Sequence, residues 1–317
     1  MRKKLSFKVD PEGRGQRLDN YLTRVLANAL PQVMSKAKAR KLIMAGAGYL
    51  NQKRVRIASK ELIQGALVDV ILDTERLFSD KASNQAAFEV QGRDVLFEDK
   101  WLIVVNKPAG IPTQATLDQA RDHLYAAVQR FLKRRDGHDP YCGLHHRLDF
   151  DTSGVVLFTK MREANAGVSA IFAERLAHKT YQAVSWNIEG KARPAPWMIK
   201  NHLDRAGKTG KDRMRFKSVS AGGDFAETRF EVLAKDLDRV LIQAEPKTGR
   251  THQIRVHLSE QGLPILGDPI YGLREREPRR SPRLMLHAYR LEFPHPITGA
   301  KIKVESPLPA EFEFTGK

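Results

Sequence analysis

Short apolar segments of strand length dominate the sequence after residue 95, and they restrict its possible folds more than any other feature. The candidate strands are VLFED, WLIVVN, VVLFTK, TYQAVSW, ETRFEVLA and RVLIQAEP. Helix-length segments lie among them near 117–134, 162–176 and 250–261. No apolar run approaches the ~20 residues that a helix needs to cross a membrane. The pattern predicts an α+β fold on a mainly antiparallel mixed sheet and excludes membrane insertion.

A separate small α+β domain is predicted over residues 14–73. Apolar residues recur at helical spacing from Arg17 to Leu30, and the proline that follows ends the helix. Ser35 is predicted to cap a second helix, SKAKARKLIMAG, which short strands follow. Residues 74–94 lack clear periodicity and are predicted to be a linker, so the larger domain is expected over 95–317.

The charge of the chain favours a polyanionic partner. Basic residues exceed acidic ones by 17 overall, and residues 1–73 alone hold 15 basic and 6 acidic residues. Such an excess attracts nucleic acid, although a merely solubilising surface is the alternative. We expect Lys36, Lys38 and Arg40 to share one helix face. The basic residues expected to contact RNA phosphates in the small domain are Arg17, Lys36, Lys38, Arg40, Lys53 and Arg54.

Other residue patterns argue against disulfides, secretion and metal chemistry. The single cysteine, Cys142, cannot form an internal disulfide, and no signal-peptide core follows the basic N-terminus. A cytoplasmic location is therefore expected. Six histidines lie near carboxylates, but neither an HExxH nor a paired-cysteine motif is present. We expect no metal and no cofactor.

The densest cluster of reactive side chains is HHRLDFDTSG, residues 145–154, which precedes the apolar strand VVLFT. From the residues alone, three interpretations of Asp149 and Asp151 remain open. They are a metal-binding pair, a nucleophile with its neighbour, or loop carboxylates that cap backbone amides.

This segment resembles the HRLDxxTSG motif of the RluA-type pseudouridine synthases. Further segments match that family's motifs in the same order and extend the resemblance over about residues 95–310. They are NKPAG at 106–110, HKTYQAV at 178–184, KTGRTHQIRVHL at 247–258, GLPILGDPIYG at 262–272 and LMLHA at 284–288. The resemblance implies an enzyme that isomerises uridine to pseudouridine in structured RNA without a cofactor.

The same resemblance implies roles for five residues. Asp149 corresponds to the catalytic carboxylate, acting either as nucleophile at the sugar or as base toward it, and Arg255 to the arginine that pairs with it. Tyr181 corresponds to the tyrosine that stacks on the uracil and acts in proton transfer. Arg147 matches the arginine that fills the space left by the flipped base, and Leu286 the apolar residue against the uracil ring. Purely structural roles for these residues are the alternatives.

The small domain resembles the RNA-binding domain named after the fourth protein of the small ribosomal subunit. The matching segments are GQRLDNYL, SKAKARKLI, GYLNQKRV and ALVDVIL. The family usually has an Asn-Gly corner where this chain has Asn51-Gln52-Lys53, which leaves the turn type open. With this domain, ribosomal large-subunit RNA is the expected substrate, transfer RNA remains possible, and no protein partner is implied.

Two other functions compete with this interpretation. One is a non-catalytic RNA-binding or ribosome-assembly factor that keeps the fold without the activity. The other is a metal-dependent nuclease that uses the aspartate and histidine cluster. Intact Asp149, Tyr181 and Arg255 favour the enzyme.

Overall fold

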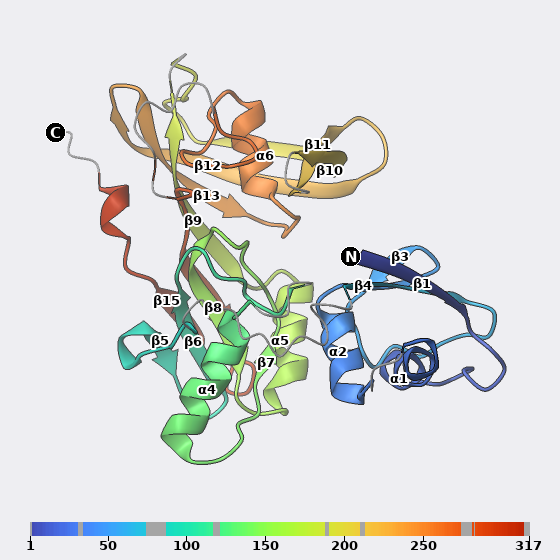
Figure 1. The fold of residues 1–317 in the computed structure, drawn as a ribbon. Coiled ribbons are helices and arrows are strands. Elements are labelled where there is room, and N and C mark those ends of the chain that lie inside the picture. The colour runs from blue at the N-terminus through green and yellow to red at the C-terminus, as the bar shows by residue number, and fades with distance from the viewer. Residues whose placement is uncertain are drawn as a thin grey trace. The chain divides into compact units, whose positions relative to one another are not determined.

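The computed structural model describes residues 2–30, 34–73, 87–116, 121–187, 190–209, 213–273, 281 and 283–313. The chain divides into two compact units (Figure 1). The N-terminal unit contains residues 1–88 and 114–127, and the C-terminal unit contains residues 89–113 and 128–317. Each unit has its own buried hydrophobic core.

The N-terminal unit is an antiparallel sheet of four strands with two helices. The strand order is β1-β4-β2-β3. The bounds of the elements are Arg2–Lys8 (β1), Leu18–Ala29 (α1), Lys36–Met44 (α2), Gly48–Leu50 (β2), Lys53–Val55 (β3) and Leu67–Asp73 (β4). The apolar stripe of α1, which includes Leu22 and Leu26, packs in one core with Ile43 of α2 and Val70 of β4. The predicted amphipathic helix is therefore confirmed.

Local side-chain chemistry explains how α2 starts and how the hairpin after it turns. The Ser35 hydroxyl accepts a hydrogen bond from the Lys38 amide at 3.2 Å, which confirms the predicted cap. Asn51 and Gln52, between β2 and β3, have φ angles of 48° and 66°. Two-residue hairpin turns with both central φ angles positive match the twist of the strands they join. The Asn51 side chain supports this turn by accepting a hydrogen bond from the Leu67 amide at 2.8 Å.

Two expectations for the N-terminal unit are wrong. Its sheet begins at β1, ahead of the predicted boundary at residue 14, because β1 pairs with β4 along its whole length. Lys38 does not share a face with Lys36 and Arg40, because only residues three or four apart face the same way on a helix. Lys36 and Arg40 are exposed, whereas Lys38 is half-buried.

The C-terminal unit is built on one large mixed sheet. Its strand order is β11-β10-β12-β13-β9-β14-β8-β6-β5, with β15 paired to β14 and β7 to β8. The bounds are Val95–Glu98 (β5), Leu102–Lys107 (β6), Gly143–Leu144 (β7), Ser153–Thr159 (β8), His178–Trp186 (β9), Trp197–Thr209 (β10), Arg213–Val219 (β11), Asp224–Asp236 (β12), Arg239–Pro246 (β13), Leu286–Pro294 (β14) and Lys301–Glu305 (β15). Among the described strands, only β8 and β14 pair in parallel. The predicted α+β fold with a mainly antiparallel mixed sheet is confirmed.

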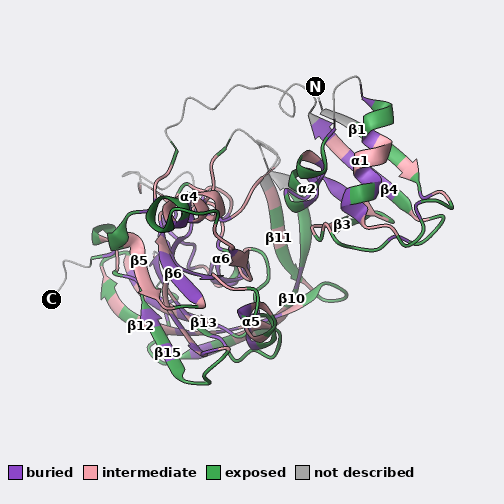
Figure 2. Cartoon of the chain, turned by 90° about the horizontal axis from the view of Figure 1, so that it is seen from below, coloured by how far each residue is buried: buried purple, intermediate pink, exposed green. Residues whose placement is uncertain are grey.

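Helices cover parts of this sheet, and the core lies between the layers. The helical segments of the remaining chain are Gly92–Asp94 (η1), Leu124–Asp136 (α4), Ala164–Ala173 (α5), Gln253–Glu260 (α6) and Ala310–Phe312 (η2). Ile254 and Leu258 of α6 pack with Phe230 and Ile242 of the sheet. A second cluster joins α5 to β6, β8 and β14. Figure 2 shows β6 as almost continuously buried, which explains its unbroken apolar sequence.

The predicted linker lies largely outside the described residues, which resume at residue 87. Its last part is not a linker, because η1 precedes β5 directly and Val90 is buried. The helix predicted over 117–134 begins only at Leu124, and residues 117–120 lie outside the described range. No helix in the described parts of the chain is long and apolar enough to cross a membrane.

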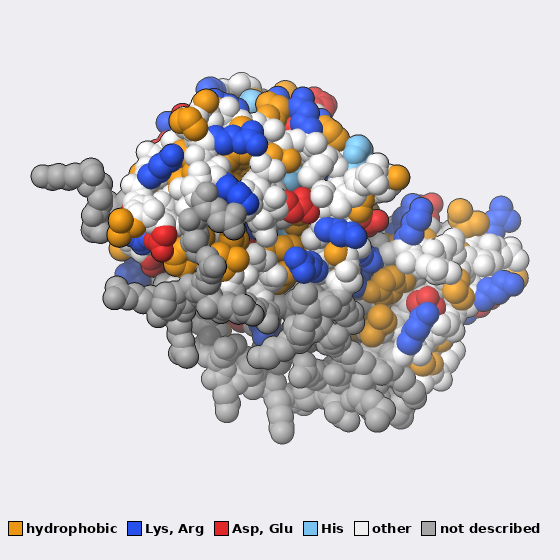
Figure 3. Space-filling model, turned by 90° about the horizontal axis from the view of Figure 1, so that it is seen from above, with side chains coloured by type: hydrophobic (Ala, Val, Ile, Leu, Met, Phe, Trp, Pro, Cys, Tyr) orange, Lys and Arg blue, Asp and Glu red, His pale blue; other side chains and the backbone are white. Residues whose placement is uncertain are grey.

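Basic side chains are spread over the surface of the molecule. On the face seen in Figure 3, lysine and arginine side chains lie scattered, with fewer acidic ones between them. This distribution accords with the formal net charge of +17. A surface of this kind attracts polyanions over long distances at low ionic strength.

Candidate active site

The backbone before Asp149 is held by a reciprocal pair of hydrogen bonds. The Leu148 amide donates to the Thr113 hydroxyl at 3.1 Å, and that hydroxyl donates to the Leu148 carbonyl at 2.8 Å. Both residues are buried. Asp149 itself is 24% exposed at its side chain. The loop therefore presents a carboxylate from a fixed backbone to a partly open space.

The backbone after Asp149 is held by the lysine of the NKPAG segment. Lys107 is fully buried, and its ammonium donates to the carbonyls of Pro108 at 2.9 Å, Ile111 at 2.8 Å and Phe150 at 3.1 Å. The Phe150 carbonyl also accepts a hydrogen bond from the Gly110 amide at 3.0 Å. Burial lowers the pKa of Lys107 to about 7. This lysine ties segment 107–111 to the loop that carries Asp149.

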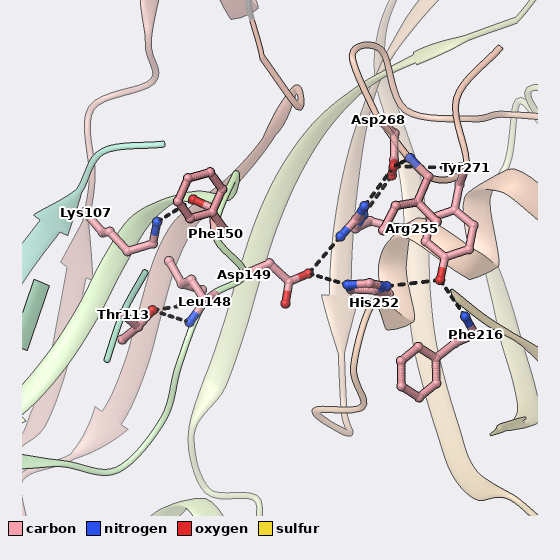
Figure 4. A network of polar contacts seen from close by, with 11 residues as sticks. Lys107, Thr113, Leu148, Asp149, Phe150, Phe216, His252, Arg255, Asp268 and Tyr271 are labelled. Carbon is pink, nitrogen blue, oxygen red and sulfur yellow. Dashed lines mark hydrogen bonds and ion pairs between the residues drawn. The ribbon is translucent and has the colours of Figure 1, made fainter. Parts of the chain in front are cut away.

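Arg255 of α6 joins two carboxylates (Figure 4). Its Nη1 donates to Oδ2 of Asp149 at 3.2 Å. Its Nε and Nη2 donate to the two oxygens of Asp268 at 2.7 and 2.8 Å, in the parallel geometry that an arginine fork favours. Asp268 is itself held by the amides of Ile270 and Tyr271, which donate to its Oδ1 at 2.9 and 3.1 Å. The guanidinium is therefore held in place by contacts other than its hydrogen bond to Asp149.

A second chain of contacts reaches Asp149 through His252, which precedes α6 with a left-handed φ of 58°. The Tyr271 hydroxyl accepts a hydrogen bond from the Phe216 amide at 2.8 Å and lies 3.0 Å from Nδ1 of His252. Burial lowers the pKa of His252 to about 4, so the ring is neutral at pH 7. With the Tyr271 hydroxyl donating to Nδ1, we assign the proton to Nε2, which lies 3.8 Å from Oδ2 of Asp149.

The site keeps Asp149 ionised. Burial alone raises the pKa of a carboxyl group, but the charges of His252, Arg255 and Arg147 together outweigh it, and the pKa of Asp149 lies below its ordinary value of 3.8. Because His252 is neutral at pH 7, Arg255 and Arg147 carry that positive charge under neutral conditions. Asp149 is therefore a carboxylate at neutral pH.

Tyr181 and Leu286 lie on neighbouring strands on the same side of the sheet. Leu286 of β14 is paired with Ala183 of β9, and Tyr181 lies two residues before Ala183, so both side chains face one way. Leu286 is buried in the cluster against which Tyr181 packs. Burial, and then the charge of Asp149, raises the pKa of Tyr181 above its ordinary value of 10.0. The protonated phenol of Tyr181 thus lies within reach of the charge of Asp149, and Leu286 belongs to the apolar cluster against which Tyr181 packs.

Ser153 and Gly154 explain how β8, which follows the Asp149 loop, can pair in parallel with β14. Gly154 has φ of +115°, and a Cβ atom there would lie 2.2 Å from the carbonyl oxygen of Ala288. Only glycine permits so close an approach of two backbones. Beside it, the Ser153 hydroxyl lies 2.8 Å from Nδ1 of buried His287. These residues fix β8 against β14, the strand that carries Leu286.

Three residues of this network do not appear among the predicted site residues. They are Asp268, Tyr271 and His252, which lie in the quoted segments GDPIYG and THQIR. The motifs were a usable signal for them. The spacing of these residues along the chain was not a usable signal, because nothing in the sequence indicates that Asp268 folds back onto Arg255.

The predicted RNA-contacting residues lie in the N-terminal unit. Arg17 and Arg40 both pair with buried Asp19, at 2.9 and 3.5 Å. The Arg54 guanidinium lies 5.2 Å from the centre of the Tyr49 ring. The two predicted lysines that are exposed are Lys36 and Lys53. Among the described residues of the chain, no group of three or more His, Cys, Asp or Glu side chains is placed to hold a metal ion.

Comparison with known proteins supports one family. Residues 101–260 match the family model described as RNA pseudouridylate synthase. The chain is 32% identical to the ribosomal large subunit pseudouridine synthase C of Vibrio cholerae, over 96% of this chain and 93% of that protein. It is also 32% identical to an uncharacterized RNA pseudouridine synthase of Bacillus subtilis, over 84% of this chain and 85% of the relative.

Solved structures agree with the sequence relatives. The human RNA pseudouridylate synthase domain containing 4 superposes with a TM-score of 0.56 at 26% identity, over 69% of this chain and 90% of that one. The human domain containing 1 gives a TM-score of 0.51 at 25% identity, over 69% and 86%. The motif order, the fold and the relatives agree, and the chain belongs to the RNA pseudouridylate synthase family of RNA-modifying isomerases.

Proposed function

We propose that this chain isomerises a uridine of ribosomal large-subunit RNA to pseudouridine, with Asp149 as the catalytic carboxylate. The observation that carries the proposal is the position of Asp149, partly exposed and 3.2 Å from the Arg255 guanidinium. The substrate is inferred from relatives such as the ribosomal large subunit pseudouridine synthase C of Vibrio cholerae. Transfer RNA is the alternative substrate, and a cytoplasmic location belongs to the proposal.

The reaction needs a carboxylate that stays ionised. The bond between N1 of the base and C1′ of the sugar breaks, the base rotates, and a bond forms between C5 and C1′, while the C5 proton is lost and N1 gains one. An ionised carboxylate can attack C1′ or take a proton from the sugar. Both routes are served by the lowered pKa of Asp149, to which the charges of His252, Arg255 and Arg147 contribute.

The remaining predicted residues receive the base. A uridine in folded RNA must leave its stack, at a cost of roughly a few kcal/mol. Tyr181 offers a ring for stacking and Leu286 an apolar surface for the other contacts of the uracil. Arg147 is exposed two residues before Asp149, and its planar guanidinium suits the space that the base vacates.

The N-terminal unit is proposed to hold the RNA. Lys36 of α2 and Lys53 at the β2–β3 hairpin present exposed charges. Arg17, Arg40 and Arg54 add positive charge to this unit, although Arg17 and Arg40 share theirs with Asp19, and Lys38 adds charge on another side of α2. Phosphate contacts of this kind position an RNA without reading its sequence.

Mapping of pseudouridines in ribosomal RNA tests the proposal. RNA from cells with and without the gene is modified chemically and read by primer extension. We expect at least one large-subunit pseudouridine to vanish without the gene and to return when the gene is restored. Loss from transfer RNA alone would move the activity to that substrate. Unchanged maps of both RNAs would favour the non-catalytic binding or assembly factor.

A further inference from the structure

The Tyr271 ring of the catalytic site lies near two guanidinium groups that differ in their surroundings. Cζ of Arg255 lies 5.3 Å from the ring centroid, and Cζ of Arg215 lies 5.8 Å from it. Arg255 is buried and is balanced by the carboxylates of Asp149 and Asp268. Arg215 is exposed and has no ion pair with any other residue that the structure describes. Within the described parts of the chain, one of the two cations therefore lacks an anion.

Arg215 belongs to a strand that is connected to the active site through its backbone. β11 ends the strand order of the sheet, so within the described chain one edge of β11 has no neighbouring strand. The Phe216 amide donates to the Tyr271 hydroxyl, and the Phe216 ring packs edge-on against His252 at 5.6 Å (Figure 4). Side chains alternate along a strand, so Arg215 and Lys217 share the side opposite to Phe216. Both are exposed.

The geometry favours an anionic ligand at this strand. A guanidinium at the ring face keeps its hydrogen-bond donors available, and its planar fork matches the oxygens of a phosphate. The charge of Arg215 acts on the site, because together with Arg255 it opposes the rise that burial causes in the pKa of Tyr271. A nucleotide that reaches Asp149 brings a backbone phosphate on each side of its sugar. Such a phosphate can supply the anion that Arg215 lacks among the residues that the structure describes.

We propose that Arg215, supported by Lys217, binds a phosphate of the RNA backbone close to the target uridine, and that β11 is an RNA-binding edge of the catalytic sheet. The inference rests on the proposed function for the nature of the ligand. It adds a contact in the C-terminal unit to the contacts expected from the N-terminal unit. The contact positions the RNA strand that carries the uridine.

Charge variants of the full-length chain test the contact. The probe is the shortest stem-loop of ribosomal large-subunit RNA that the chain binds, and all variants carry Asp149→Asn so that the RNA is not converted. One phosphate contact contributes about 0.7–0.9 to the slope of log K against log salt. Relative to 1 M salt, this corresponds to about fivefold in affinity at 0.15 M salt. We expect Arg215→Gln to weaken binding by this factor and to lower the slope by this amount.

Two further variants separate a phosphate contact from a general loss of charge or of structure. Arg215→Lys keeps the charge, and we expect it to retain most of the salt slope. Arg229→Gln removes a charge that Glu245 and Glu231 already balance at 3.1 and 3.6 Å, so binding should stay at the parent value. Parent-like binding by Arg215→Gln, or an equal loss from Arg229→Gln, would overturn the proposal.

A double-mutant cycle identifies the phosphate itself. Single phosphates around the bound uridine are replaced by uncharged methylphosphonate linkages, and each RNA is measured with and without Arg215→Gln. We expect the two losses to overlap at one or two neighbouring linkages and to add elsewhere. Additive losses at every linkage would contradict the contact. Because the probe is chosen by binding, this result is independent of pseudouridine formation by the parent chain, whose absence would instead contradict the proposed function.

Discussion

At the scale of single residues, the site depends on how Arg255 divides its hydrogen bonds. Two of its nitrogens are held by buried Asp268, which leaves one for Asp149. An arginine held by Asp149 alone could bond both oxygens of that carboxylate, and its guanidinium would move with the Asp149 side chain. The arrangement keeps Asp149 ionised while one side of its carboxylate stays available to a substrate.

Removal of Arg255 should damage both stability and activity. Arg255→Ala leaves Asp268 buried without its partner, and breaking a buried pair costs about 3–5 kcal/mol. We expect a loss of this size in the free energy of unfolding, measured with urea, together with loss of pseudouridine formation. As a control, Arg229→Ala removes a partly exposed arginine paired with Glu245, which should cost only about 0–1 kcal/mol. Parent-like melting of Arg255→Ala would show that the pair with Asp268 is absent.

At the level of helices and strands, a strong periodicity of apolar residues is enough to predict an element from the sequence. The pairing of strands that lie far apart in the chain cannot be predicted in this way. The helix from Arg17 and the buried strand VVLFT follow from the spacing and length of apolar runs, as α1 and β8 show. The parallel pairing of β8 with β14 joins residues about 130 positions apart, and no local pattern encodes it. For the same reason the sequence pointed to Asp149 and Arg255 through their motifs but missed Asp268.

Buried histidines between the sheet and its covering elements should make stability depend on pH. His257 of α6 is fully buried between Thr228 and Asn201, and burial lowers its pKa from 6.5 to about 4. Between these pH values the unfolded chain binds the proton and the folded chain does not. Stability from this group is therefore complete above about pH 6.5 and falls as the pH drops toward 4.

Urea unfolding at pH 5 and pH 7 checks this expectation. The free energy of unfolding should be lower at pH 5, and His257→Gln should reduce the difference between the two values. His202→Gln, at an exposed position, should keep the parent's difference. Equal pH dependence in all three proteins would mean that His257 is not neutral in the folded chain.

At the scale of the whole molecule, positive charge is divided between the two units. Residues 1–73 carry a larger share of the net charge than their length explains, although basic side chains lie on both units. Charge of this kind governs how fast the chain meets the RNA and how tightly it binds it, rather than the chemical step. Variants in the N-terminal unit should therefore act on binding, while variants of Asp149 should act on conversion.

Replacement of Lys36 and Lys53 together by Gln should weaken RNA binding and make its salt dependence shallower. Each phosphate contact that is lost should lower the slope by about 0.7–0.9. Lys133→Gln is the matched control, because its ammonium already pairs with Asp139 at 2.6 Å. A salt slope unchanged by the double replacement would show that these lysines form only a solvated surface.

The yield of pseudouridine from Asp149→Asn tests the catalytic role of Asp149, with Asp151→Asn as the matched variant in the same loop. We predict that Asp149→Asn forms no pseudouridine, yet folds and binds RNA like the parent, because the amide keeps the shape of the side chain but not its charge. Asp151→Asn should retain most of the activity, since no motif role falls on it. Near-parental yield from folded Asp149→Asn would contradict a catalytic role for Asp149, and equal loss from both variants would favour a paired-carboxylate site.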